Sequence, residues 1–329
     1  MADPTYPLFS VFAFLGFVLG LVPFPWHLHA WNAGTCVFML WASLSSFVQF
    51  VNSVVWFGSM DNVAPVWCDI ASTFLIGAGV GIPAASLCIN RRLYHIASVR
   101  TVSISPQDKR RAVLVDIAIS IGIPMLVMIL QSVLNNFAGH RYDIVEDIGC
   151  LPTTFWTPVA IPLAFMWPTV IGCISFVYAA LTLRAFWIRR TRFKELLSSN
   201  ESLTVSRYFR LMLLPIVEMS CTIPISLFAV YIITHGVPMS PWKSWSDTHY
   251  HFSYVGQLPA VVWRSDPSRR ISFEMTRWLN PCSALLFFSL FGFADEAKRQ
   301  YRKAFNCIKK TVSCWTSKET CAAQCTGNR

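Results

Sequence analysis

The chain carries little charge, and its first part carries no positive charge at all. Charged residues make up 13% of its 329 residues, whereas they make up about a quarter of a typical soluble domain. No Lys or Arg precedes residue 91. Hydrophobic residues account for 54% of the chain. This composition excludes an ordinary soluble domain and indicates a protein embedded in a membrane.

Catalytic and metal-binding groups are also scarce where a membrane enzyme would need them. All seven histidines lie in loops or at the ends of apolar runs, which excludes a zinc hydrolase built inside the membrane. The apolar run 271–293 has no lysine for retinal, and no catalytic carboxylate pair or Ser/His dyad is visible. The cysteines near the C-terminus lack both a CxxC pair and a neighbouring histidine. We therefore expect no enzymatic activity, no metal and no cofactor.

What the chain does have is long apolar runs. About 20 consecutive apolar residues are enough for one helix to cross the bilayer core. Seven runs satisfy this length: 7–26, 34–57, 67–89, 112–134, 158–181, 211–234 and 271–293. The first run is too long for a signal peptide and has no basic segment before it, so we expect a retained helix. The predicted fold is an all-α membrane protein: a compact seven-helix bundle over residues 1–294, followed by a tail over residues 295–329.

The positive charges are divided unevenly between the two sets of connections. Residues 91–111, residues 184–210 and the tail together hold 21 of the 27 Lys and Arg residues. Because Lys and Arg are retained on the cytoplasmic side, we expect an extracellular N-terminus and a cytoplasmic C-terminus in a multi-pass plasma-membrane protein. This distribution favours anionic membrane lipids and an intracellular protein as partners, and it disfavours nucleic acid.

The eleven cysteines divide by position along the chain. Cys68 and Cys150 are the only two on the predicted outer face, where oxidising conditions favour a disulfide between them. Two free buried thiols are the alternative. Cys307 and Cys314 follow the last run on the cytoplasmic side, where they are candidates for palmitoylation.

A few residues inside the runs predict contacts within the bundle. Ionisable groups are costly in lipid and tend to face the bundle interior. Arg277 is expected to pair either with Glu274, three residues earlier, or with Glu218 of the preceding run. Gly16 and Gly20 have the spacing at which helices approach closely. They predict tight packing within the bundle, with a contact between two copies of the chain as the alternative.

The tail begins with an amphipathic pattern. Its apolar residues recur at helical spacing, with Lys and Arg between them: Ala297, Tyr301, Ala304, Phe305, Ile308 and Val312. A basic amphipathic helix of this kind lies in the membrane interface. We expect such an interfacial helix after the seventh run.

Four strings taken together resemble one receptor family. They are GIPAASLCINRRLY at 81–94, DIGCLP at 147–152, FEMTRW at 273–278 and FFSLFGFA at 287–294. They are similar to the fungal a-factor-type (lipopeptide) mating-pheromone receptors, which are class D G-protein-coupled receptors. The resemblance covers roughly residues 6–305.

This resemblance implies a receptor for a farnesylated peptide pheromone that activates a heterotrimeric G protein. We expect the pheromone to bind in the outer half of the bundle, near Trp67, Asp69, Glu274, Arg277 and Trp278. We expect the G protein to bind the arginines at the inner ends of the helices: Arg91, Arg92, Arg189, Arg190, Arg192 and Arg207. A secondary transporter is the alternative function, although such a protein usually contains an internal repeat and none is visible.

Overall fold

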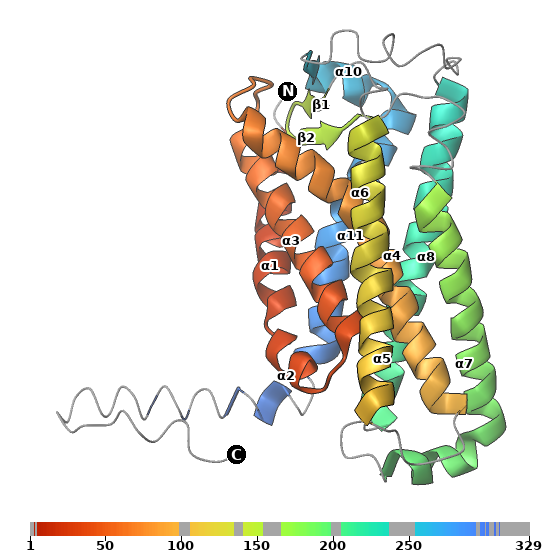
Figure 1. Ribbon diagram of the computed structural model, residues 1–329. Coiled ribbons are helices and arrows are strands. Elements are labelled where there is room, and N and C mark those ends of the chain that lie inside the picture. The colour runs from red at the N-terminus through yellow and green to blue at the C-terminus, as the bar shows by residue number, and fades with distance from the viewer. Residues whose placement is uncertain are drawn as a thin grey trace.

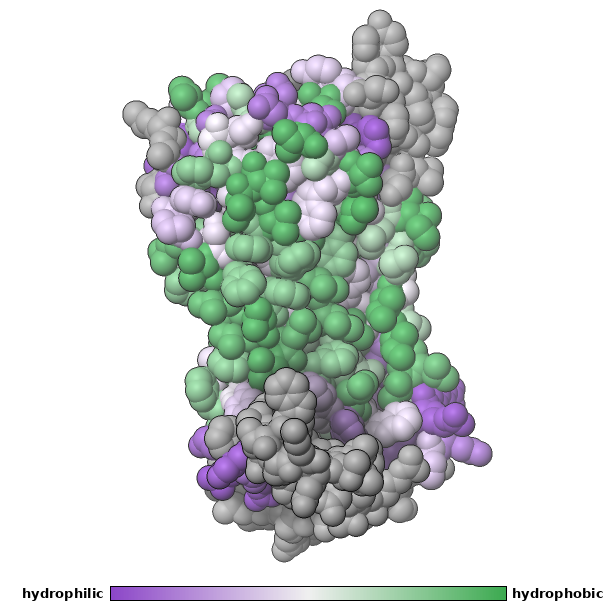
Figure 2. Space-filling view, turned by 90° about the vertical axis from the view of Figure 1, so that its left-hand side faces the viewer, coloured by the Kyte–Doolittle hydropathy of each residue, from purple (hydrophilic) through white to green (hydrophobic). Residues whose placement is uncertain are grey.

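The computed structural model describes the helical bundle and part of its connections. The described residues are 3, 5–98, 106–134, 141–153, 166–198, 205–236 and 254–293, together with 297–299, 301, 302, 306 and 309. In this part of the chain, six helical segments are long and apolar enough to cross a membrane: Leu8–His29, Ala33–Val55, Pro65–Ser98, Pro106–Gln131, Met166–Ile188 and Phe209–Ile232. They lie at the first six predicted runs. Figure 2 shows a broad apolar band around the middle of the molecule, with polar residues toward both ends.

The bundle is built from helices that run between two ends (Figure 1). Its helices are α1 (Leu8–Leu21), α2 (Phe24–His29), α3 (Ala33–Val55), α4 (Pro65–Ser98), α5 (Pro106–Ile117), the π-helical turn η1 (Ala118–Gly122), α6 (Ile123–Leu134), α7 (Met166–Ser198), α8 (Val205–Gly236), α10 (Ala260–Ser265) and α11 (Pro267–Phe291). Helix α11 packs against α1, α3 and α8. It is not one of the six apolar helices, because its first turns carry charged residues such as Arg269, Arg270 and Arg277. A seventh span therefore stays a prediction.

Several helices are longer than the apolar runs suggest. Helix α4 continues to Ser98, α7 continues to Ser198 and α8 begins at Val205. The basic segments predicted as connections, 91–111 and 184–210, are therefore largely helical. Lys and Arg are good helix formers, so a helix continues past the point where its sequence stops being apolar. Hydropathy therefore indicates where the apolar part of a helix ends, but it does not determine where the helix itself ends.

A proline in the fourth run determines one contact in the middle of the bundle. Pro124 has no backbone N–H, so the carbonyl of Ser120, four residues earlier, loses its α-helical partner. The indole of Trp41 on α3 donates to this carbonyl over 3.0 Å. Gly81 on α4 leaves room for the ring, since a Cβ there would lie 2.5 Å from two indole atoms. The η1 turn surrounds Ser120, and the contact ties α3 to it.

One end of the bundle carries a small sheet that the all-α prediction misses. Its strands are β1 (Tyr142–Val145), β2 (Gly149–Pro152) and β3 (Gly256–Leu258). Strand β1 lies in the centre, antiparallel to β2 and parallel to β3. Gly149 has a φ of +95°, and a Cβ there would lie 2.6 Å from the side chain of Asn52, so this turn needs glycine. We call this end of the bundle the sheet end, and the other end the Arg91 end.

The pair Gly16 and Gly20 faces the inside of the bundle. A Cβ on Gly16 would lie 3.3 Å from the Cα of Pro281, and one on Gly20 would lie 3.3 Å from the Cβ of Ala284. Both neighbours belong to α11, so the two glycines bring α1 and α11 together within one chain. The two glycines thus serve packing within the bundle, and a contact between two copies of the chain stays a prediction.

Candidate functional site

A disulfide holds the sheet to the bundle. Cys68 at the start of α4 is bonded to Cys150 in β2, with 5.2 Å between their Cα atoms. The side chain of Asn52 on α3 donates to the carbonyl of Cys150 over 3.3 Å. It also accepts a hydrogen bond from the indole of Trp67 over 2.8 Å. Trp67 is therefore fixed at the junction of α3, α4 and the sheet.

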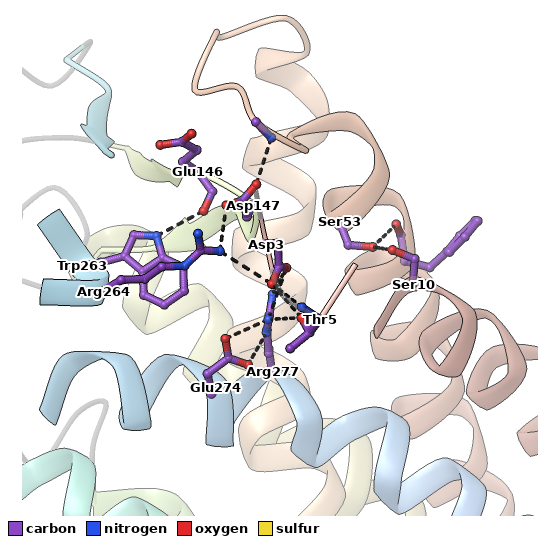
Figure 3. A network of polar contacts seen from close by, with 12 residues as sticks. Asp3, Thr5, Ser10, Ser53, Glu146, Asp147, Trp263, Arg264, Glu274 and Arg277 are labelled. Carbon is purple, nitrogen blue, oxygen red and sulfur yellow. Dashed lines mark hydrogen bonds and ion pairs between the residues drawn. The ribbon is translucent and has the colours of Figure 1, made fainter. Parts of the chain in front are cut away.

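Arg277 of α11 lies at the centre of a buried polar network at the sheet end (Figure 3). Its side chain is only 3% exposed. Its Nε and Nη2 donate to the two carboxylate oxygens of Glu274 over 2.9 and 2.8 Å. Nη2 also donates to the hydroxyl of Thr5 over 2.7 Å. The guanidinium carbon lies 4.6 Å from the centre of the Phe9 ring. Of the two partners left open by the sequence, the structure selects Glu274; in the described residues, Glu218 instead accepts a hydrogen bond from Thr222.

A second arginine enters the same network from α10. Nη2 of Arg264 donates to Asp147 over 2.8 Å. The other carboxylate oxygen of Asp147 accepts from the backbone N–H of Gly58 over 2.9 Å. The guanidinium carbon of Arg264 lies 4.7 Å from the centre of the neighbouring Trp263 ring, and the Trp263 indole donates to the carbonyl of Glu146. These contacts join α10 to the β1–β2 turn.

Asp3 connects the two arginines. One of its carboxylate oxygens lies 3.3 and 3.4 Å from the two Nη atoms of Arg277. The other lies 3.6 Å from Arg264 and accepts hydrogen bonds from the backbone and the hydroxyl of Thr5. Burial raises the pKa of Asp3, but the Thr5 hydrogen bonds and the Arg277 charge outweigh it, so the pKa lies below its ordinary value. The carboxylate is thus ionised at neutral pH.

The other predicted ligand-binding residues have their own partners. Asp69 on α4 forms an ion pair with Arg141, in which the arginine Nε donates over 3.0 Å. The Trp278 ring packs edge-on against Phe9 and Phe12 of α1, with ring centres 5.1 and 5.9 Å apart. Glu274 and Arg277 are therefore brought into one cluster, whereas Asp69 and Trp278 contact other elements.

Sequence reasoning missed four members of the network: Asp3, Thr5, Asp147 and Arg264. Asp3 and Arg277 are at opposite ends of the sequence, and no local pattern marks such a pair. The buried arginine gave the one available signal, because a charge inside the bundle requires a counter-charge. That signal indicates that an acidic partner exists, but it does not show where this partner lies in the sequence.

The Arg91 end is held by a buried ion pair. Arg91 of α4 donates to Asp116 of α5 over 2.9 Å, and Asp116 is only 2% exposed. Arg92 points to different partners: it donates to the carbonyl of Trp31 over 2.6 Å and lies 3.4 Å from the side-chain oxygen of Asn32. Neighbouring arginines on α4 therefore fasten two different elements to this end of the bundle.

The remaining predicted contact residues lie on helices that end or begin at the Arg91 end. Arg189, Arg190 and Arg192 belong to the last part of α7, and Arg207 belongs to the first turn of α8. Cys307 and Cys314 lie outside the described residues. In the tail, Ala297 is buried and the Tyr301 ring lies 5.9 Å from that of Trp26, so the tail begins against α2. The interfacial helix stays a prediction.

Comparison with known proteins identifies the family. The sequence profile of the pheromone A receptors matches residues 8–310. The chain is 49% identical over 305 residues to the pheromone B alpha 3 receptor of Schizophyllum commune, covering 93% of this chain and 48% of that protein. It is 33% identical to pheromone receptor 1 of Ustilago hordei, covering 97% of this chain and 87% of that protein. It is 25% identical to the pheromone a factor receptor of Saccharomyces cerevisiae, covering 90% and 61%.

These matches extend over nearly the whole described bundle and confirm the family resemblance of the four strings. The chain spans about half the length of the Schizophyllum relatives it matches, at 48% of each. The profile match begins at the first residue of α1 and continues past the end of α11. The chain is a multi-pass membrane protein that belongs to the pheromone A receptor family.

Proposed function

We propose that the chain is the membrane domain of a mating-pheromone receptor that signals through a heterotrimeric G protein. The observation that carries this proposal is the family match over residues 8–310, which includes both ends of the bundle. Receptor signalling requires a ligand-binding end, a partner-binding end and helices that connect them. The buried network around Arg277 and the arginines of the Arg91 end are suited to these two roles.

In this proposal α11 is the seventh span and the sheet end is extracellular. The disulfide between Cys68 and Cys150 favours an oxidising environment for the sheet end. The basic segments lie at the other end, which favours a cytoplasmic location for it. Arg277 enters the membrane region with its charge paired to Glu274 and Asp3. That pairing lowers the cost of placing α11 in the bilayer.

The ligand in this proposal is a farnesylated peptide that binds at the sheet end. The peptide part binds near Trp67, Asp69, Glu274, Arg277 and Trp278. The farnesyl chain needs an apolar surface, and the sheet end offers exposed aliphatic side chains. Val66 at the start of α4 and Val261 in α10 are 70% and 71% exposed.

The G protein in this proposal binds at the Arg91 end. A ligand shifts the equilibrium between two helix arrangements by binding one of them more tightly. Helix α11 links the two ends, since Arg277 in its first half belongs to the network at the sheet end and Phe291 at its last residue packs on His27 of α2. A displacement of α11 would reach α8 directly, because α11 packs against α8 and Arg210 of α8 donates to the carbonyl of Leu290. Palmitoyl groups on Cys307 and Cys314 would hold the tail at the membrane.

The proposal is tested by reconstitution of the chain in lipid nanodiscs with a heterotrimeric G protein. A panel of farnesylated peptides is screened for stimulated nucleotide exchange, and each active peptide is compared with its unfarnesylated twin. We expect exchange with the farnesylated peptide alone. Arg277→Ala should abolish the response, whereas Arg270→Ala, an exposed arginine two turns earlier on α11, should retain it. Substrate accumulation in vesicles without any exchange response would instead favour the transporter.

A further inference from the structure

We infer that Asp3 occupies the place of a carboxylate of the peptide ligand, so that the ligand binds by displacing the chain's own N-terminal segment from Arg264 and Arg277. This inference rests on the proposed function, because it takes the sheet end as the ligand site. It adds two features: an acidic group in the ligand and a competitor within the receptor.

The network contains one acid more than its arginines require. Arg277 has Glu274 as a bidentate partner, with distances of 2.9 and 2.8 Å. Arg264 has Asp147 as its partner at 2.8 Å. Asp3 is the third acid, shared between the two arginines. If Asp3 left, each arginine would keep one carboxylate, Glu274 for Arg277 and Asp147 for Arg264.

Asp3 also makes the longest carboxylate contacts with the two arginines. Its carboxylate oxygens lie 3.3 and 3.4 Å from the Nη atoms of Arg277 and 3.6 Å from Arg264. Well-formed hydrogen bonds between an ionised donor and a carboxylate are about 2.7–2.9 Å long. Glu274 and Asp147 meet this range and Asp3 does not. Asp3 is therefore the member of the network that a ligand exchanges most easily.

The two arginines are held in place without Asp3. Each guanidinium lies over an aromatic ring, Arg277 over Phe9 at 4.6 Å and Arg264 over Trp263 at 4.7 Å. Such stacking fixes the plane of the guanidinium. Among the described residues, Nη1 of Arg277 donates to Asp3 alone. Departure of Asp3 would therefore leave a preorganised pair of donors that fits a carboxylate.

The displaced segment leads directly into α1. Asp3 is held by Thr5, whose hydroxyl also accepts from Arg277 over 2.7 Å. Two carboxylates cannot share this position, since like charges at short range repel each other. Binding of an acidic ligand therefore requires release of residues 3–5, three residues ahead of the first helix. Only receptors in which Asp3 is undocked can bind the ligand. The apparent affinity is therefore the intrinsic affinity multiplied by the fraction of undocked receptors.

The experiment measures peptide binding to the full chain in nanodiscs, without G protein. The probes are fluorescent farnesylated peptides that contain Asp or Glu, each paired with an Asn or Gln twin. They are tested on the wild type, on Asp3→Asn and on Asp3→Ala. Asp61→Asn is the matched control, since Asp61 is an exposed acid at the same end whose carboxylate accepts from Ser59. If Asp3 is docked in nine receptors of ten, at least one acidic peptide should bind both Asp3 variants about tenfold more tightly than the wild type. Its amide twin should show no such gain, and Asp61→Asn should bind like the wild type.

Several results would overturn the inference. They are equal affinity of the acidic peptide for wild type and Asp3→Asn, an equal gain for both twins, or no binding of any acidic peptide. Loss of folding in both Asp3 variants, seen as loss of the thermal transition, would overturn it as well, because a replaceable residue cannot be essential. The proposed function is tested separately by nucleotide exchange. A peptide that stimulates exchange equally in wild type and Asp3→Asn would support the proposed function and contradict the inference about Asp3.

Discussion

The two ends of the bundle are built on different principles. The sheet end combines short strands, a disulfide and a network in which two arginines, one of them buried, meet three acids. In the described part of the Arg91 end, the secondary structure is helical and one buried ion pair, Arg91 with Asp116, joins α4 to α5. The sheet end thus keeps its charges satisfied within the chain. The Arg91 end has arginines near the ends of α4, α7 and α8 that meet there, a pattern suited to an external partner.

This difference indicates that the sheet end is more rigid than the Arg91 end. At the sheet end, a covalent bond and bidentate charge pairs fix the positions of side chains that come from distant parts of the sequence. A binding site needs such preorganisation, because less free energy is lost in ordering groups that are already in place when the ligand binds. At the Arg91 end, contacts between helices can change with the helix arrangement. The following predictions test this contrast, beginning with the largest expected effect.

Removal of the disulfide should have the largest overall effect, because it should lower stability and also abolish peptide binding. The double variant Cys68→Ala/Cys150→Ala opens a link between residues that are 82 positions apart, and loss of a native disulfide typically costs about 2–5 kcal/mol. We expect a lower melting temperature for the purified receptor and loss of peptide binding. Cys173→Ala, on the exposed face of α7, is the control and should leave both unchanged. An unchanged melting temperature in the double variant would mean that the sheet is held by its other contacts.

Breaking the ion pair at the Arg91 end should have the next largest effect. Arg91→Ala leaves the Asp116 carboxylate buried without its counter-charge, which typically costs about 3–5 kcal/mol. The second substitution Asp116→Asn removes the stranded charge, so Arg91→Ala/Asp116→Asn should recover most of the lost thermal stability. Arg92→Ala is the comparison, and it should cost less because Arg92 donates to neutral oxygens. Equal losses for Arg91→Ala and Arg92→Ala would argue against the buried pair.

The contrast between the ends also determines what the sequence could predict. Runs of apolar residues placed six helices, because a bilayer crossing needs a long local stretch of one composition. The contact of Glu274 with Arg277 could also be predicted from a short stretch of sequence, since residues three apart share one face of a helix. Cys68 and Cys150 could be paired because they were the only cysteines on one side of the predicted membrane.

The features that sequence reasoning missed are those made by distant segments. The sheet was missed because its strands are three or four residues long and too short to show alternation. The docking of Asp3 onto Arg264 and Arg277 depends on how the N-terminal segment, α10 and α11 meet, and the identity of each residue alone does not determine this. The same holds for Arg91 and Asp116, whose separation of 25 residues crosses a connection.

An exposed ion pair at the sheet end should contribute little. Arg141 and Asp69 have side chains that are 41% and 33% exposed, and exposed pairs contribute about 0–1 kcal/mol. Arg141→Gln should therefore shift the melting temperature slightly, far less than Arg91→Ala. High salt should reduce even this shift, because exposed pairs are screened. A loss as large as that of Arg91→Ala would show that the sheet end depends on its surface charges as well as on its buried network.

The smallest expected effect is a pH dependence that comes from Asp3. Its pKa lies below the ordinary 3.8 in the folded chain. A carboxyl group with a depressed folded pKa adds stability that is fully present above its unfolded pKa, and this stability is lost as the pH falls through the folded value. The melting temperature of the wild type should therefore exceed that of Asp3→Asn at neutral pH, and the difference should shrink below about pH 4. Asp61→Asn, measured in parallel, should show no such convergence. A constant difference between wild type and Asp3→Asn across this range would mean that folding does not lower the pKa of Asp3, so that neither Thr5 nor the arginines favour its charged form and a ligand carboxylate would gain equally little there.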